Sequence, residues 1–229
     1  MTKQIIFTSI ALMVTIVFFE LTNIDLLLQN YFYDMQLHTW LVNDDNVLLD
    51  LIFYSGIKKI YIAFALALLT SLVFFYKRPL IQHYKQGIII VLLSLIIVPS
   101  TVSLLKASTN VACPKHLTLY GGDYPYVSVL DAYPSDFHQE KKVKCFPAGH
   151  ASGGFALMAL FFLFKSKKNK RIALVSAITI GWGTGSYKML IGDHFLSHTI
   201  VTMVIAWLLI LCITTITHLV FKRIGRNIK

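Results

Sequence analysis

The chain has 229 residues, of which 56% are hydrophobic, and it carries a formal net charge of +10 at pH 7. Soluble domains typically contain about 45–50% apolar residues, so this composition argues against a soluble globular protein. The positive charge lies in short clusters between apolar runs, an arrangement that argues against nucleic-acid binding and favours orientation in a membrane. The sequence therefore predicts a single membrane domain over residues 1–229.

Apolar segments recur along the chain and predict an all-α integral membrane protein with six transmembrane helices. The segments cover approximately residues 5–28, 52–76, 87–105, 148–164, 172–190 and 195–221. Each approaches the roughly 20 residues that a helix needs to cross a hydrocarbon core of about 30 Å. The first segment contains Glu20 and Asp25, so its membrane part is expected to end near residues 19–21. No small-x-small cleavage site follows it, which argues against a signal peptide.

The basic residues predict how these helices are oriented. Thirteen of the 21 Lys and Arg residues fall on one side of the predicted spans, whereas all 11 acidic residues fall on the other. The thirteen are Lys3, Lys77, Arg78, Lys85, Lys165, Lys167, Lys168, Lys170, Arg171, Lys222, Arg223, Arg226 and Lys229. Short basic loops are typical of the cytoplasmic face, so both termini are expected in the cytoplasm. A bacterial inner membrane is our working hypothesis for the location.

The longest connection is an outer loop over residues 106–147. Turn-forming residues interrupt it at Pro114, Gly121, Gly122, Pro125 and Pro134, and predict turns and short helices. Loops of this length are usually functional or disordered. Cys113 and Cys145 both fall in this loop, where an oxidising compartment would allow a disulfide; two separate thiols are the alternative.

Two histidines fall where apolar segments meet this outer side. His150 opens the fourth segment, and His194 lies in the tight break between the fifth and the sixth. Lys106 ends the third segment, and Lys188 lies near the outer end of the fifth. A phosphate group needs cations or N–H groups to hold its oxygens, and its transfer needs a nucleophile and an acid. Histidine can serve in both of these last two roles, so the pattern predicts phosphate chemistry on a lipid.

The order and spacing of these residues resemble the type 2 phosphatidic acid phosphatase (PAP2) superfamily. Its motifs read K, six residues, R-P; then P-S-G-H; then S-R, five residues, H, three residues, D. The corresponding segments here are Lys106…Cys113-Pro114, Pro147-Ala148-Gly149-His150 and Lys188…His194…His198. In each of the three segments, the number of residues between the motif positions is the same as in the family pattern. The resemblance covers about residues 87–221.

The resemblance implies a PAP2-like helical bundle that hydrolyses a lipid phosphate or pyrophosphate on its outer face. His194 would attack phosphorus and form a phosphohistidine, and His150 would protonate the leaving oxygen and then activate water. Lys106 and Lys188 would hold the phosphate, together with backbone groups at Ala148 and Gly149. No metal or other cofactor is implied. The implied partners are the lipid phosphate and membrane lipids, and the sequence identifies no protein partner.

The motifs depart from the family pattern at five positions. Cys113 stands in place of Arg, Ala148 in place of Ser, Tyr187-Lys188 in place of Ser-Arg, and His198 in place of Asp. His198 follows His194 by four residues and shares its helical face, so a neutral His198 is expected to accept the N–H of His194. A Cys113–Cys145 disulfide would hold the first motif beside the second.

Other charged residues are candidates to replace the missing family side chains. Asp193, Asp131 or Asp136 is a candidate for the missing negative charge. Lys115 is a candidate for the missing positive charge, as are the three lysines Lys141, Lys142 and Lys144.

Several functions fit this pattern. The expected substrates are undecaprenyl pyrophosphate, phosphatidylglycerol phosphate, phosphatidic acid or lipid A phosphates, and phosphoryl transfer to another lipid would use the same intermediate. One alternative is a catalytically inactive PAP2-like protein that binds lipid. Another is a metal site built from His150, His194 and His198, because histidines at positions i and i+4 of a helix can share one metal.

Overall fold

The computed structural model describes residues 1–139 and 141–227, and almost all of the regular secondary structure in them is helical. Its α-helices are α1 (Thr2–Glu20), α2 (Ile24–Gln29), α3 (Val47–Asp50), α4 (Gly56–Phe74), α5 (Pro79–Ser108), α6 (Gly149–Ala156), α7 (Leu160–Leu163), α8 (Lys167–Leu190) and α9 (Leu196–Asn227). Shorter helical turns are η1 (Leu51–Ser55), η2 (Pro114–His116), η3 (Thr118–Tyr120) and η4 (Leu157–Ala159). Strands β1 (Tyr33–Asp34) and β2 (Thr39–Trp40) form a small antiparallel hairpin. Glu140 is one of the 11 acidic residues and Lys229 one of the 13 basic residues that predict the orientation, and both lie outside the described residues.

Within the described residues, four helices are long and apolar enough to cross a membrane. They are Thr2–Glu20, Val47–Phe74, Pro79–Ser108 and Leu196–Gly225. The segment predicted as the fourth span forms a shorter apolar helix, Gly149–Leu163. The segment predicted as the fifth lies in α8, whose first turns are rich in Lys and Arg. The chain is therefore a helical membrane protein, and the count of six spans stays a prediction.

The first apolar segment is not one continuous helix over residues 5–28. Helix α1 ends at Glu20, and the separate helix α2 begins at Ile24. Polar side chains explain the break: Glu20 accepts a hydrogen bond from Ser128, and Asp25 from the backbone of Ser197. The polar residues that follow Glu20 therefore do not continue α1 and belong to the connecting chain at that end of the bundle.

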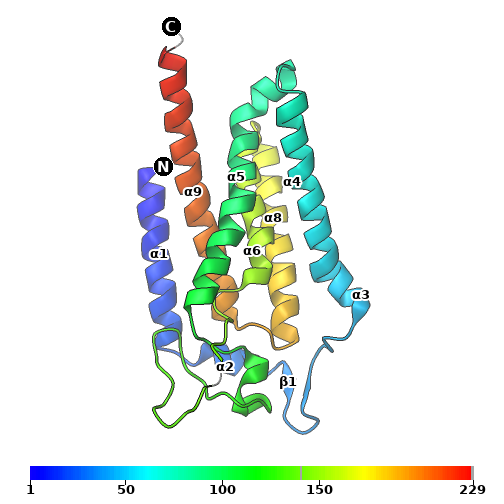
Figure 1. Cartoon of the computed structure of the whole chain (residues 1–229), viewed down its shortest axis with the longest axis vertical. Helices are drawn as coiled ribbons and strands as arrows, with labels where there is room; N and C mark the ends of the chain where they lie inside the picture. The colour runs from blue at the N-terminus through cyan, green and yellow to red at the C-terminus, as the bar shows by residue number, and fades with distance from the viewer. Residues whose placement is uncertain (140, 228–229) are drawn as a thin grey trace.

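The core of the molecule lies among α5, α6, α8 and α9. Helix α6 packs against all three of the others and lies between α5 and α8 in Figure 1. Fully buried side chains at its centre include Val91, Phe155 and Ala206. Helix α1 packs against α9, whereas α4 packs against α5 and leaves most of its apolar surface exposed. Exposed apolar faces of this kind fit a lipid surrounding.

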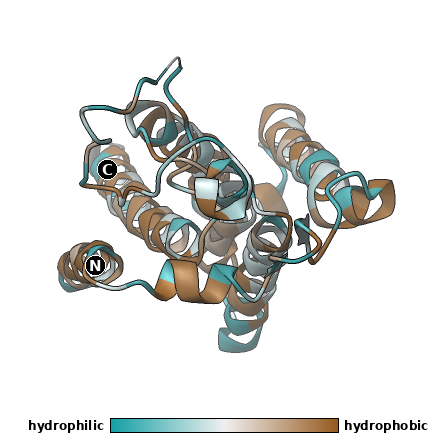
Figure 2. Ribbon diagram, turned by 90° about the horizontal axis from the view of Figure 1, so that it is seen from below, coloured by the Kyte–Doolittle hydropathy of each residue, from teal (hydrophilic) through white to brown (hydrophobic). Residues whose placement is uncertain are grey.

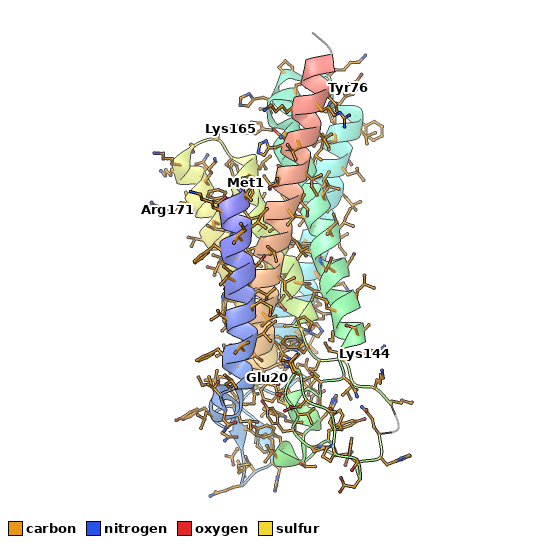
Figure 3. All side chains as sticks on the ribbon, turned by 90° about the vertical axis from the view of Figure 1, so that its left-hand side faces the viewer. Met1, Glu20, Tyr76, Lys144, Lys165 and Arg171 are labelled. Carbon is orange, nitrogen blue, oxygen red and sulfur yellow. A yellow bond between two sulfur atoms is a disulfide. The ribbon has the colours of Figure 1, made fainter. Side chains whose placement is uncertain are left out.

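The two ends of the bundle differ in character. In Figure 3, Met1, Tyr76, Lys165 and Arg171 lie at one end, and Glu20 and Lys144 lie towards the opposite end. That opposite end carries the hairpin and the long loop, and we call it the loop end (residues 21–46 and 109–148). Figure 2, a view onto this end, shows brown along the long helices and teal in much of the connecting chain. The connecting chain at the loop end is therefore more polar than the helices that it joins.

Candidate functional site

Short contacts bring the three motif segments together at the loop end. Cys113, which follows α5, is joined by a disulfide to Cys145, just before α6. The backbone N–H of Lys115 donates to the carbonyl oxygen of Gly192 at 2.9 Å. The N–H of Ala148 donates to the carbonyl oxygen of His198 at 3.2 Å. The first and second motifs are thus both attached to the third.

His150 and His194 are in direct contact at the centre of this region. Nδ1 of His150 lies 3.0 Å from Nε2 of His194, so one ring nitrogen carries the proton that the other accepts. His150 comes from the first turn of α6, and His194 from the turn between α8 and α9. The edge-to-face ring of Tyr54, 4.9 Å away between centroids, supports His150. The sequence places these two residues 44 positions apart, and the fold makes them one unit.

His198 lies behind His194, on the side away from His150. Its Nδ1 is 3.4 Å from Nδ1 of His194, and both side chains are only 1% exposed. The rings of Phe146 and Phe195 meet His198 edge-on and fix its orientation. Nδ1 of His194 also lies 3.6 Å from Sγ of Cys145, a sulfur that can act only as a weak acceptor because it is in a disulfide. These neighbours favour a proton on Nδ1 of His194, so that the lone pair of Nε2 accepts the hydrogen bond from Nδ1 of His150.

The protonation of His194 follows from its surroundings. Burial lowers the pKa of His194 well below its usual range, and the neighbouring His198 and His150 and nearby lysines lower it further. The imidazole is therefore neutral near pH 7. A neutral imidazole with an available ring nitrogen is the form that can act as a nucleophile.

Two lysines meet one carboxylate beside the histidine pair. Nζ of Lys188 lies 3.0 Å from Oδ2 of Asp193, and Nζ of Lys115 lies 2.8 Å from Oδ1 of the same residue. The Lys188 ammonium also lies 4.8 Å above the ring of Tyr54. Burial alone would raise the pKa of Asp193, but hydrogen bonds and charge from Lys115 and Lys188 hold it below its usual range. The carboxylate is therefore ionised and bridges two cations.

Lys106 reaches the site from α5 through a neighbouring cavity. The cavity has a volume of about 350 Å³ and is lined by Tyr54, Ile57, Lys58, Tyr61, Pro99, Ser103, Lys106, Gly149, His150, Ser152, Gly153, Gly154 and Thr184. A Cβ atom added to Gly149 would lie 3.7 Å from Cδ of Lys106, so the lysine passes directly over the start of α6. The first N–H groups of α6 lack partners within the helix and favour an anion at this end.

The backbone of Ala148 is hydrogen-bonded to α9. Its N–H donates to the carbonyl oxygen of His198, and its own carbonyl accepts from the hydroxyl of Thr202. Contact between this amide and a phosphate would require the bond to His198 to open, and the phosphate-binding role of Ala148 stays a prediction. The residue attaches the start of α6 to α9. Gly149, where α6 begins, is among the residues that line the cavity.

The other charged candidates lie differently from the Asp193 group. Asp131 accepts a hydrogen bond from Ser128, and both Asp131 and Asp136 are exposed. The three lysines of the loop, Lys141, Lys142 and Lys144, are exposed as well. Asp193 was a candidate for the negative charge that the family Asp places beside the histidine. It precedes His194 in the chain, but its carboxylate contacts Lys115 and Lys188 and not the imidazole.

Some residues of the site were not singled out by sequence reasoning as functional. Asp25 is 5% exposed and accepts the backbone N–H of Ser197 at 2.8 Å, at the start of α9. The side-chain amide of Gln29 donates to the carbonyl oxygen of Met189. The only sequence signal was an acid at the end of an apolar run, which is costly to bury without a partner. The contacts from α2 to α8 and α9 could not be predicted from the sequence, because they depend on how the helices pack.

Gly192 is required by the shape of the turn before His194. Its φ angle is +75°, a backbone conformation that favours glycine. A Cβ at this position would also lie 2.4 Å from the ring of Trp40 in β2. The hairpin therefore packs directly on the turn that carries Asp193 and His194.

A group that could hold a metal ion comprises Cys145, His194 and His198, whose ligand atoms lie within 4.8 Å of one another. Cys145 is in the disulfide, so its sulfur is not the thiolate that binds zinc. His194 and His198 would be the two available donors, with His150 close to the first. This group fits a metal less well than the three-histidine hypothesis supposed.

Comparison with known families matches residues 87–222, more than half of the chain, to the PAP2 superfamily. The match includes all three motif segments and confirms the resemblance seen in the sequence. Neither the curated proteins nor the solved structures contain a match.

Proposed function

This chain belongs to the PAP2 superfamily, a membership that supports a phosphatase-type enzyme, and on that premise we propose that it hydrolyses a membrane lipid phosphate or pyrophosphate through a phosphohistidine. The observation that carries the proposal is the 3.0 Å contact between His150 and His194 beside Lys106 and Lys188. Nucleophile, acid and cations are the groups that phosphoryl transfer needs, and they lie at one surface.

In the first step, a phosphate lies beside the two imidazoles, with its oxygens near the lysines and the start of α6. Nε2 of His194 attacks phosphorus, and the bond between phosphorus and the lipid oxygen breaks. The negative charge of the bound phosphate favours a protonated His150, which gives its proton to that oxygen, and the lipid alcohol leaves. From a lipid pyrophosphate, the bond that breaks is the P–O–P bond, and the lipid monophosphate leaves. His198 accepts the Nδ1 proton of His194 in a hydrogen bond and steadies the ring as positive charge develops.

In the second step, water replaces the lipid alcohol. His150, now neutral, takes a proton from the water as its oxygen attacks phosphorus. The P–N bond breaks, inorganic phosphate leaves, and His194 recovers its lone pair. A lipid alcohol in place of water would give a phosphotransferase by the same route.

The cavity beside His150 supports a lipid as the substrate. Its lining combines cations and small polar residues with apolar side chains such as Ile57 and Pro99. A second, apolar cavity shares Ile57 and Tyr61 with it and continues along α4. Polar lining next to apolar lining suits a phosphorylated headgroup joined to an acyl or isoprenoid chain. The substrate candidates remain undecaprenyl pyrophosphate, phosphatidylglycerol phosphate, phosphatidic acid and lipid A phosphates.

The deciding experiment measures phosphate release by purified protein from these four lipids in excess chelator. Three proteins are compared: the unaltered chain, His194→Ala, and His83→Ala as an exposed control at the start of α5. Release that is lost in His194→Ala and kept in His83→Ala supports the proposal. Absence of release from every folded protein would favour an inactive lipid-binding relative. Activity that requires added metal would favour the histidine metal site.

The proposed location places the loop end outside the cytoplasm of a bacterial inner membrane. Single cysteines at the exposed positions Asp123 and Lys168 test it, in a Cys212→Ser background. A membrane-impermeant maleimide should label Asp123→Cys in intact spheroplasts and Lys168→Cys only after permeabilisation. The reverse pattern would overturn the orientation.

A further inference from the structure

The carboxylate of Asp193 occupies Lys188, one of the two lysines that the proposed function uses, together with Lys115. Its two oxygens are divided between two ammonium groups, with Oδ2 on Lys188 and Oδ1 on Lys115. The side chains of Lys188 and Asp193 are 9% and 14% exposed, and that of Lys115 is 34% exposed. The bridge is thus largely shielded from water, where charge–charge contacts are less screened than on the surface.

A phosphate group would make the same contacts. Lysine ammonium groups hold phosphate oxygens as point charges, and a phosphate monoester presents more negative charge than a carboxylate. Two anions cannot both occupy the same ammonium groups without strong mutual repulsion. Binding of phosphate to Lys188 therefore requires that Asp193 release at least one of its two contacts.

We propose that Asp193 is an internal competing anion: it occupies Lys188 and Lys115 in the free protein, and substrate phosphate displaces it. The inference rests on the proposed function and adds Lys115 to the groups that bind the phosphate. Asp193 acts through the two lysines and is a positioning residue. It keeps both ammonium groups beside the histidine pair, and it lowers the affinity of every anion that must displace it from the two lysines.

The low pKa of Asp193 agrees with this role, since the carboxylate stays ionised over the working range of pH. The turn geometry holds it in place as well. The backbone N–H groups of Asp193 and His194 both donate to the carbonyl oxygen of Lys188, at 2.8 and 3.2 Å. The competing anion and the nucleophile are therefore carried on one turn.

Asp193→Asn tests the inference, because the amide keeps the shape and removes the charge. Competition by inorganic phosphate is measured on the full chain in detergent, with the best substrate of the four-lipid panel. The inhibition constant of phosphate and the KM should both fall by on the order of threefold to tenfold, the equivalent of a partly shielded ion pair. The effect should shrink as salt is added. An unchanged or larger inhibition constant would show that Asp193 does not compete with phosphate.

Asp44→Asn is the matched control. Asp44 lies 3.8 Å from the same Lys115, but its side chain is 55% exposed. Its removal should leave the inhibition constant of phosphate within about twofold, as for other exposed pairs. If Asp44→Asn and Asp193→Asn had equal effects, the change would come from the net charge of the protein and not from the position of Asp193, and the inference would be overturned.

Lys115→Gln provides a second, independent variant in case Asp193→Asn does not fold. Loss of this cation should weaken phosphate inhibition by a similar factor, whereas a purely structural role of the bridge predicts no change. Calorimetry of inorganic phosphate binding to unaltered protein distinguishes a failure of the proposed function from a failure of the competing-anion inference. If unaltered protein neither binds phosphate nor releases it from lipid, the proposed function fails. If it does both and the variants behave like it, only the competing anion is refuted.

Discussion

At the residue scale, His198 stands where the family has a carboxylate, and under the proposed function this replacement changes the chemistry of the proposed nucleophile, His194. A carboxylate behind an imidazole stabilises the positive charge that forms during the reaction, by analogy with hydrolytic triads. A neutral imidazole offers a hydrogen-bond acceptor and no charge. His194 is therefore oriented, through the 3.4 Å contact, with less stabilisation of its cationic form.

His198→Ala should lower kcat by about a hundredfold and leave KM within about twofold, because orientation of the nucleophile is lost and phosphate binding is not. His198→Gln keeps an acceptor and should retain more activity than the Ala variant. Steady-state kinetics on the best substrate check both values. Equal losses in the two variants, at unchanged melting temperature, would assign His198 a packing role alone.

At the element scale, α6 and α8 approach each other through glycine. A Cβ at Gly154 would lie 2.6 Å from Cα of Gly181, and a Cβ at Gly181 would lie 2.3 Å from the ring of Phe155. Small residues at such crossings let helix backbones come close, a common device in membrane bundles. The crossing holds the short helix α6, and with it His150, against the bundle.

Gly181→Ala should destabilise the protein by about 1–3 kcal/mol, because the added methyl group must displace a buried ring. Gly183→Ala is the control on the same helix, where a Cβ would meet Phe53 at an ordinary 3.8 Å. That variant should match or slightly exceed the unaltered protein, since Ala favours helix more than Gly does. Melting temperatures of the two variants and of unaltered protein in detergent test this prediction. Equal stability of the two variants would rule out the tight crossing.

Helix α9 begins against a buried acid from α2. Burial raises the pKa of Asp25 to about 6, although hydrogen bonds from Ser197 and Leu196 lower it in part. Between about pH 4 and pH 6, the folded protein holds a proton that the unfolded chain has released. This contribution to stability is therefore complete below about pH 4 and is lost as the pH rises through about 6.

Asp25→Asn should remove that pH dependence, because the amide never ionises and its oxygen still accepts from Ser197. Relative to unaltered protein, the variant should gain stability as the pH rises from about 4 to about 7. Melting temperatures of both proteins across this range give the comparison. A difference that stays constant with pH would contradict the burial of an ionisable carboxyl.

At the scale of the whole molecule, the loop end behaves as a cap over the helix ends. The long loop is fastened by the Cys113–Cys145 disulfide and by the backbone contact from Lys115 to Gly192. The first loop is fastened by Gln29 and by the packing of Trp40 on Gly192. Both loops converge on the turn that carries His194, so their attachment and the geometry of the site depend on each other.

Reduction of the disulfide should therefore lower both melting temperature and activity. A bond that closes 32 residues restricts the unfolded chain by on the order of 3–4 kcal/mol in the chain-entropy model. Cys113→Ser with Cys145→Ser should reproduce the loss without reductant. Cys212→Ser, at the remaining cysteine, should melt like unaltered protein and respond to reductant in the same way. Identical gel mobility of alkylated protein with and without reductant would count against the bond.

The sequence by itself determined the class of the protein and its family, and it predicts which residues are reactive. Apolar runs and basic clusters are local properties, so they predict a helical membrane protein without any knowledge of contacts. Motif spacing is local too, and it led to the PAP2 superfamily and to His150, His194 and His198. Residues of one motif are only a few positions apart in the sequence, which is why their proximity could be predicted.

Only the tertiary structure decided how the motifs meet and which groups are already occupied. The amide of Ala148 is used by His198, and the lysines at positions 115 and 188 share Asp193. Asp25 reaches Ser197 across 172 positions of sequence. Such contacts join segments that have no common periodicity, and any of several charged loop residues could have made them. The packing of the loop end selects among these residues, because burial leaves room only for charges that find a partner.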